Sequence, residues 1–379
     1  MAIADLPRTR ALLLRGIEQR EQLGAQLAVS RGAAASPSPE RFELALGERQ
    51  PGQPMTADTL NIWLSTTKPL TAAACALLWQ RGLFDLDDKV AKFVPEFAGG
   101  GKEDISLRHL LTHTAGIRML NVGWPEASWD EIVAKICASR IEPRWVPGEK
   151  AGYHMASSFF ILGEVIARLA GDPFRDFVRR ELFEKLGMAD CYVGMPEASY
   201  ATYGDRIGRM FGTEEGRLLP RNWHNKQHTV GSSPGGNGYG PMSQLLSFYE
   251  MLLRRGRTAE GGSLLWPQTV EALTAPQRVG MVDLTFQAKI DFGLGFIVNS
   301  RHYEAELLPY GYGKHAGRRT FGHSGHQSST AFADPDHDLA VALFVNGQPG
   351  EPRHTHRFRE LAEAIYEDLG LAREVDPAR

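Results

Sequence analysis

Ser65 and Lys68 are the two residues of this chain whose types and spacing point most directly to covalent chemistry. They form a Ser-x-x-Lys motif within NIWLSTTKPLTAAACALLWQ, where an apolar strand-like run is followed by an apolar helical run. Residues three apart share one face of a helix, so the Lys68 amine can reach the Ser65 hydroxyl. A serine hydroxyl is a weak nucleophile at neutral pH unless a base lies beside it, and a buried lysine with a lowered pKa can be that base. The motif therefore indicates a nucleophilic serine activated by a lysine.

The same four residues also have a purely structural interpretation. Serine commonly caps the start of a helix, and Lys68 would then be an exposed side chain one turn further on. Under the catalytic interpretation, the backbone N–H of Ser65 lies at the helix start, lacks a helical partner and can stabilise an oxyanion. The motif alone leaves both interpretations open.

The composition of the chain argues against several kinds of partner. The 379 residues carry a formal net charge of −3, with 42% hydrophobic and 23% charged residues, which are globular values. No stripe of Lys and Arg interleaved with aromatic residues occurs, so we expect no nucleic-acid partner. No apolar run approaches the roughly 20 residues of a membrane span, and charge is spread along the N-terminal segment, so we expect no membrane partner and no signal peptide. Three widely spaced cysteines without a C-x-x-C motif indicate buried thiols and a cytoplasmic location.

Strand-like runs at both ends of the chain flank a helix-rich middle. The apolar patterns predict strands at 25–30, 42–46, 295–300, 328–333 and 339–345. Helical spacing predicts terminal helices at 8–23 and 358–369, and a helical block from about 65 to 255.

The simplest packing of these elements is an α/β fold. The terminal strands would form one antiparallel sheet, with the terminal helices on one face and the helical block on the other. We therefore expect a discontinuous α/β lobe of residues 1–60 and 285–379, a mainly helical lobe of residues 61–284, and an active site in the cleft between them.

Further strings follow the Ser-x-x-Lys motif in a recognisable order. They are Gly82-Leu-Phe-Asp-Leu-Asp-Asp-Lys-Val90, Leu107-Arg-His-Leu-Leu-Thr-His-Thr-Ala-Gly116, Trp145-Val-Pro-Gly148 with Tyr153 five residues later, Leu186-Gly187-Met188, and Gly322-His323-Ser324-Gly325. Together they resemble the serine β-lactamase and penicillin-binding-protein family over roughly residues 55–350. The closest branch is the class C β-lactamase-like hydrolases, which include family VIII esterases.

The resemblance implies the serine β-lactamase-like fold and a role for each matched residue. Ser65 would attack the acyl carbon, and Lys68 would accept its proton or hold the neighbouring base. Tyr153, as a phenolate or a hydrogen-bonded phenol, would pass a proton to the leaving group. The backbone N–H groups of Ser65 and His326 would form the oxyanion hole. No cofactor and no metal ion are implied.

Two positions depart from the lactamase pattern. The Tyr-x-Asn motif of much of the family is Tyr153-His154-Met155, and methionine cannot hold an amide substrate as asparagine does. His323-Ser324-Gly325 stands where lactamases carry Lys-Thr-Gly and many esterases carry His-x-Gly, and histidine is a weaker, pH-dependent cation. We expect five of these residues to contact the substrate: His154, Met155, His323, Ser324 and Gly325.

The predicted activity is hydrolysis of carboxylic esters, with short acyl chains, through an acyl-serine intermediate. An acyltransferase, an amide or D-peptide hydrolase and a β-lactamase could use the same site, and a non-catalytic binding protein could use the same scaffold. Gly231-Ser-Ser-Pro-Gly235 matches G-x-S-x-G, but its polar flank and the following glycines predict a loop, not a nucleophile elbow at Ser233. His109 and His113 lack the glutamate of a zinc-protease helix, and we expect a structural role for them beneath the active site.

Overall fold

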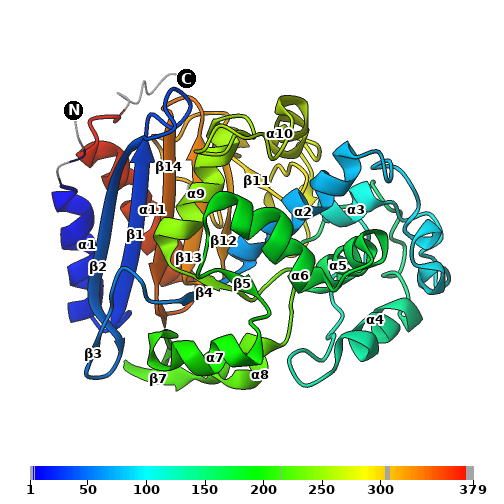
Figure 1. Cartoon of the computed structure of the whole chain (residues 1–379), viewed down its shortest axis with the longest axis horizontal. Coiled ribbons are helices and arrows are strands. Elements are labelled where there is room, and N and C mark those ends of the chain that lie inside the picture. Colours follow the sequence, from blue (N-terminus) through cyan, green and yellow to red (C-terminus); the bar gives the residue numbers. More distant parts are fainter. Residues whose placement is uncertain (1–2, 4, 215, 304–307, 373–379) are drawn as a thin grey trace.

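The largest element of the computed structural model, which describes residues 3, 5–214, 216–303 and 308–372, is a seven-stranded antiparallel sheet (Figure 1). The spatial order is β11-β12-β13-β14-β1-β2-β3, so strands from the two ends of the chain share one sheet, as predicted. The strands are β1 (Gly24–Arg31), β2 (Glu40–Gln50), β3 (Gln53–Pro54), β11 (Ile297–Val298), β12 (Phe321–Gly325), β13 (Ser329–Asp334) and β14 (Leu339–Val345). The strand predicted at 295–300 is shorter in the structure, where it corresponds to β11, because the chain turns at Gly295, where φ is +80°.

The sheet separates two hydrophobic cores, because successive side chains of its central strand, β14, point to opposite faces. The larger ones join the core beneath α1 (Pro7–Glu18) and α11 (Glu351–Asp368): Leu339, Val341, Leu343 and Val345. The smaller ones, with one phenylalanine, join the core beneath α9 (Met242–Leu253): Ala340, Ala342 and Phe344. Figure 1 shows α1 and α11 at one side of the sheet and α9 across its other face, which confirms the predicted layers.

The region between Ser65 and β11 is rich in helices, as predicted for residues 65–255. Its helices are α2 (Lys68–Gln80), α3 (Leu107–Leu111), α4 (Trp129–Ala138), α5 (Ser157–Ala170), α6 (Phe174–Val178), α7 (Glu197–Tyr203), α8 (Lys226–Val230), α9 and α10 (Pro267–Thr274). Within the predicted helical block, α6 passes directly into a π-helical turn at Arg179–Phe183. The last helix begins at Glu351, earlier than predicted, with Pro352 in its first turn, a position that proline favours.

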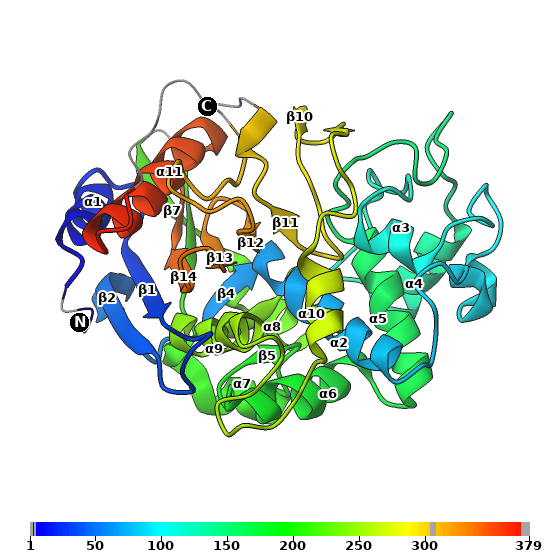
Figure 2. The ribbon, with the colours of Figure 1, turned by 90° about the horizontal axis from the view of Figure 1, so that it is seen from above.

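Three small sheets complete the described chain. Their strands are β4 (Asn61–Leu64), β5 (Tyr192–Val193) and β8 (Gly238–Gly240); β6 (Met210–Glu214), β7 (Arg217–Arg221) and β15 (Gly347–Gln348); and β9 (Val282–Asp283) and β10 (Ala288–Lys289). In the first of these sheets, β4 ends at Leu64, directly before Ser65. The last is an isolated hairpin, and Figure 2 shows β10 projecting outward between the sides of the molecule that carry α11 and α3.

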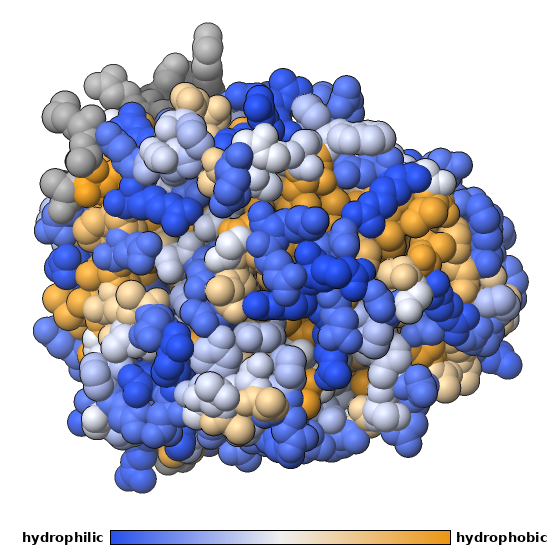
Figure 3. All heavy atoms as spheres, in the orientation of Figure 1, coloured by the Kyte–Doolittle hydropathy of each residue, from blue (hydrophilic) through white to orange (hydrophobic). Residues whose placement is uncertain are grey.

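Within the described ranges, no helix combines the length and apolar character needed to cross a bilayer. Hydrophilic side chains are spread over the face of the molecule seen in Figure 3, with apolar side chains in patches between them. The division of the chain into lobes at residues 60 and 285 stays a prediction.

Candidate active site

Ser65 lies in a sharp turn between β4 and α2. The preceding Leu64 has φ +50° and ψ −134°, a conformation that is costly for a residue with a branched side chain. The Thr67 hydroxyl holds the turn, because it donates to the Leu64 carbonyl (2.6 Å) and accepts from the Gly238 N–H (2.8 Å). Backbone strain that the surroundings maintain is typical of functional sites, and here it places Ser65 at the start of a 3₁₀ turn, Ser65–Thr67, that leads into α2.

Lys68 is completely buried, so the structural interpretation with an exposed lysine is wrong. Its Nζ lies 3.2 Å from Ser65 Oγ, 2.9 Å from the Met155 carbonyl oxygen and 2.8 Å from the Gly235 carbonyl oxygen. Burial lowers the pKa of this amine from 10.5 to about 7. A neutral amine is therefore well populated at neutral pH.

The three neighbours of Nζ orient the neutral amine. A neutral amine has two N–H donors and one lone pair, and the two carbonyl oxygens of Met155 and Gly235 can only accept hydrogen bonds. When both carbonyls take an N–H, the lone pair is left for the third neighbour, the Ser65 hydroxyl. The arrangement is that of a lysine base aimed at a serine.

The Tyr153 ring is buried beside the same amine, with its centroid 5.0 Å from Lys68 Nζ. Burial raises the pKa of the Tyr153 hydroxyl above its ordinary value of 10, and this outweighs a hydrogen bond with Ser65 that acts in the opposite direction. A cation beside a tyrosine favours the phenolate, but at Tyr153 the cost of burying a phenolate is larger. Tyr153 is a phenol at neutral pH, and a phenol can donate a proton.

The end of β12 lies against the turn that carries Ser65. Ser329 Oγ donates to the Trp63 carbonyl (2.6 Å) and lies 2.9 Å from Thr66 Oγ1. A Cβ atom at Gly325 would collide with the Trp63 carbonyl and with Ser329 Oγ, so glycine permits this close approach. The end of β12, directly before His326, thereby lies beside the Trp63–Leu64 segment that precedes Ser65. The His326 side chain points to solvent and pairs with Glu351 (3.1 Å).

His323 and Ser324 point to opposite faces of β12, as neighbouring residues in a strand do. The His323 ring is fully buried, with its centroid 5.9 Å from that of Tyr153. Burial, reinforced by the charge of Lys68, lowers the pKa of His323 to about 3. It is therefore a neutral imidazole at neutral pH and not the pH-dependent cation expected from the sequence. Ser324 Oγ donates to Thr330 Oγ1 (2.9 Å) and lines a cavity of about 320 Å³ together with Tyr310, His354 and Phe358.

The two residues after Tyr153 face in different directions. His154 is fully buried: its Nδ1 lies 3.3 Å from Nδ1 of His113, and its Nε2 accepts the Ile117 N–H (3.0 Å). Both ring nitrogens thus have internal partners, and the structure offers no free nitrogen of His154 to a substrate. The Met155 side chain is 67% exposed, and the carbonyl of this residue holds Lys68.

The G-x-S-x-G segment is a loop, as predicted, and it contributes to the site through its backbone. The Ser233 N–H donates to Asn237 Oδ1 (2.7 Å), and the Gly235 carbonyl accepts from Lys68. A Cβ atom at Gly235 would lie 3.1 Å from Lys68 Nζ, so the glycine leaves room for the amine. This contact could not be predicted from the sequence, because any residue type can supply a backbone carbonyl.

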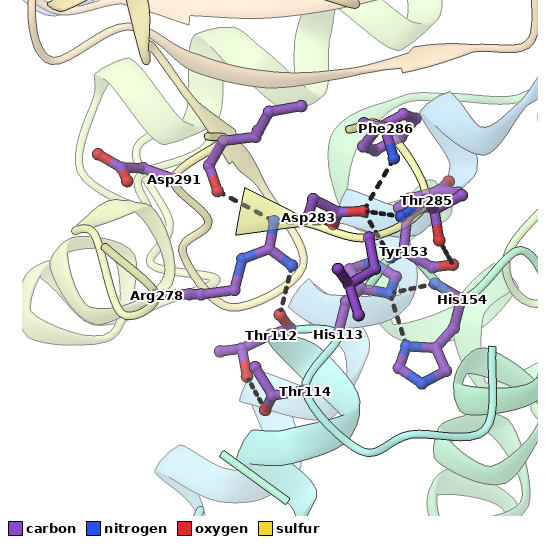
Figure 4. A network of polar contacts seen from close by, with 12 residues as sticks. Thr112, His113, Thr114, Tyr153, His154, Arg278, Asp283, Thr285, Phe286 and Asp291 are labelled. Carbon is purple, nitrogen blue, oxygen red and sulfur yellow. Dashed lines mark hydrogen bonds and ion pairs between the residues drawn. The ribbon is translucent and has the colours of Figure 1, made fainter. Parts of the chain in front are cut away.

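A polar network that the sequence did not predict lies behind Tyr153 (Figure 4). Asp283 and Arg278 form a buried ion pair at 3.0 Å, and Asp283 accepts the Tyr153 N–H (3.1 Å). The His113 ring lies 4.5 Å from the Tyr153 ring, which fits the structural role expected for His113. Among the described residues, no cluster of three or more His, Cys, Asp or Glu side chains could hold a metal ion.

The chain is similar to proteins named as esterases and β-lactamases. The chain is 28% identical over 204 residues to esterase EstB of Burkholderia gladioli, covering 48% of this chain and 50% of EstB. It is 23% identical over 317 residues to the esterase/β-lactamase LipL of Mycobacterium tuberculosis, covering 77% and 70% of the two chains. The chain spans about half the length of several curated relatives that it matches, EstB included.

A solved family VIII carboxylesterase has the same fold, with a TM-score of 0.77 and 24% identity over 97% of this chain and 98% of that chain. A sequence model of the β-lactamase family matches residues 11–366, which is nearly the whole chain. The chain therefore belongs to the β-lactamase family.

Proposed function

We propose that this protein is a serine hydrolase that cleaves small-molecule carboxylic esters through an acyl-serine intermediate. The single observation that carries the proposal is the buried Lys68 amine, 3.2 Å from Ser65 Oγ, with two backbone carbonyls orienting it and a pKa near neutrality. Similarity to EstB and LipL supports ester chemistry.

In the acylation step, Ser65 Oγ forms a bond to the acyl carbon while Lys68 accepts the hydroxyl proton. The negative charge that develops on the acyl oxygen is stabilised by the backbone N–H groups of Ser65 and His326. The bond to the alcohol then breaks, and Tyr153 gives its proton to the departing alkoxide. The protonated Lys68 returns a proton to Tyr153, so the base is restored to its neutral form.

In the deacylation step, water takes the place of the alcohol. It loses a proton to the Lys68–Tyr153 pair as its oxygen bonds to the acyl carbon, and the Ser65–acyl bond then breaks. Ser65 recovers its proton and the carboxylic acid leaves. An acceptor alcohol could enter at the same step, which would make the reaction an acyl transfer.

Esters are favoured over β-lactams by the polar groups beside Ser65. His323 stands at the position of the lactamase lysine, and its neutral imidazole cannot form an ion pair with a carboxylate. The position of the lactamase asparagine holds Met155, whose exposed side chain has no amide.

The three cysteines of the chain are buried free thiols, which supports the further proposal of a reducing, cytoplasmic location. Cell fractionation with a tagged full-length chain tests it.

Turnover of p-nitrophenyl acetate and butyrate by the purified protein tests the proposed activity. We expect release of nitrophenol that disappears in Ser65→Ala and persists in the matched control Ser233→Ala. Equal activity of the wild type and Ser65→Ala would refute the proposal. Addition of a competing alcohol, with detection of the new ester, separates hydrolysis from acyl transfer.

A further inference from the structure

The β9–β10 hairpin lies along the segment that carries Tyr153. The Leu284 N–H donates to the Ala151 carbonyl (2.9 Å), and Ala151 and Asp283 form a β-bridge. The hairpin belongs to none of the larger sheets and projects outward in Figure 2. The hairpin therefore contacts the Tyr153 segment directly.

Both backbone groups of Tyr153 are bound by this hairpin (Figure 4). Asp283 Oδ1 accepts the Tyr153 N–H at 3.1 Å, and the Thr285 hydroxyl donates to the Tyr153 carbonyl at 3.1 Å. The same Asp283 oxygen also accepts the N–H groups of Thr285 (2.9 Å) and Phe286 (3.1 Å). One carboxylate oxygen thus ties the hairpin turn and the tyrosine into a single unit.

The Tyr153 ring is packed by two further residues. Phe286, from the hairpin, has its ring centroid 4.9 Å from that of Tyr153, and His113 lies on the ring at 4.5 Å. The hairpin therefore fixes the tyrosine through its backbone and its side chain.

The hairpin is anchored by the buried pair of Asp283 and Arg278. Arg278 Nη2 lies 3.0 Å from Asp283 Oδ2 and donates to the Ile290 carbonyl at 3.0 Å, while Nη1 donates to the Thr112 carbonyl at 3.2 Å. This arginine connects the base of the hairpin to the residue before His113. The negative charge of Asp283 also acts to raise the pKa of the Tyr153 hydroxyl, which helps to keep it protonated.

We propose that Asp283 and Thr285 are positioning residues that hold Tyr153 in line to protonate the leaving group. The inference rests on the proposed function, because it assigns the hairpin a role through the proton that Tyr153 delivers. Misplacement of a reacting group by about 1 Å can cost about 100-fold in rate, so a clamp on both backbone groups has catalytic value.

Thr285→Val is the main test, because it removes the hydroxyl from an exposed residue while keeping its shape. The substrates are two acetate esters, p-nitrophenyl acetate and an alkyl acetate, and kcat/KM is measured for each because it reports acylation. Nitrophenoxide is a weak base that leaves without a proton, whereas an alkoxide needs one. We expect Thr285→Val to lower kcat/KM about tenfold for the alkyl ester and at most about twofold for the nitrophenyl ester.

Three further variants separate positioning from general structural damage. Thr285→Ser restores the hydroxyl and should recover most of the alkyl-ester activity. Thr202→Val removes a comparable hydroxyl, which donates to the Ala198 carbonyl on the exposed helix α7, and should change neither substrate. In a Tyr153→Phe background, Thr285→Val should cause no additional loss. Asp283→Asn should reproduce the selective loss, provided that its thermal unfolding shows a folded protein.

Loss of equal size for both esters, or a full additional loss in the Tyr153→Phe background, would overturn the positioning role. If Tyr153→Phe itself hydrolyses the alkyl ester at the wild-type rate, the failure lies in the proposed mechanism instead. The two failures are therefore distinguishable.

Discussion

The rate of ester hydrolysis should rise with pH around neutrality, because Lys68 acts as a base only when it is neutral. Burial brings its pKa from 10.5 to about 7, which corresponds to about 5 kcal/mol of preference for the neutral amine in the folded protein. We expect kcat/KM for p-nitrophenyl acetate to fall at acidic pH and to reach half of its plateau near pH 7.

Other buried groups near the site should not obscure this transition. Burial and the charge of Lys68 lower the pKa of His323 to about 3, and burial raises that of Tyr153 above its ordinary range, so neither changes charge near pH 7. A profile of kcat/KM from pH 5 to pH 9 at constant ionic strength, corrected for spontaneous hydrolysis, measures the midpoint.

Lys68→Arg is the matched variant for this test, because arginine stays protonated and cannot accept the serine proton. It should lose as much activity as Lys68→Ala, about 10²–10⁴-fold, although it keeps a positive charge. A flat profile across neutrality, a midpoint near the ordinary lysine value, or substantial activity in Lys68→Arg would refute the assignment of Lys68 as the base.

Three further predictions follow from the same geometry. Tyr153→Phe should lower kcat for alkyl esters by about 10²–10⁴-fold, and the double variant with Lys68→Ala should be little worse than the poorer single variant, as steady-state kinetics would show. Cephalosporins should be hydrolysed far less efficiently than p-nitrophenyl butyrate, because His323 is neutral; comparable kcat/KM values in parallel assays would contradict this. Between about pH 7 and 10.5 the unfolded chain retains a proton on Lys68 that the folded chain has released. The unfolding free energy of the wild type should therefore rise with pH relative to that of Lys68→Met, by up to about 1.4 kcal/mol per pH unit. Parallel pH dependence of the two unfolding free energies in denaturant titrations would argue against a lowered lysine pKa.

The sheet and its covering helices could be predicted because long apolar runs and helical spacing are strong local signals. The run at 339–345 coincides with β14, which is buried on both faces. The edge strand predicted at 295–300 is longer than the observed β11, because some of its apolar residues are buried in a turn and not in the strand.

The position of Lys68 beside Ser65 could be predicted because both residues lie within one turn of the chain. The groups that orient Lys68 could not, because the carbonyls of Met155 and Gly235 are distant in sequence and any residue type can supply a carbonyl.

The electrostatics of Tyr153 and His323 could not be predicted from the sequence. The sequence left a phenolate at Tyr153 open and indicated a pH-dependent cation at His323. Both groups are buried, and the cost of burying a charge exceeds the attraction or hydrogen bonding that would stabilise one. Burial depends on tertiary packing, which spacing along a chain does not reveal.

The most direct test is to identify the residue that becomes covalently modified. A serine-directed phosphonate, or a slowly deacylating ester, should add one group per chain, and peptide mass spectrometry should place that group on Ser65. Lys68→Ala should slow the modification without changing its location. Modification of Ser233 in place of Ser65, or no covalent adduct during active ester turnover, would contradict an acyl-serine mechanism at this site.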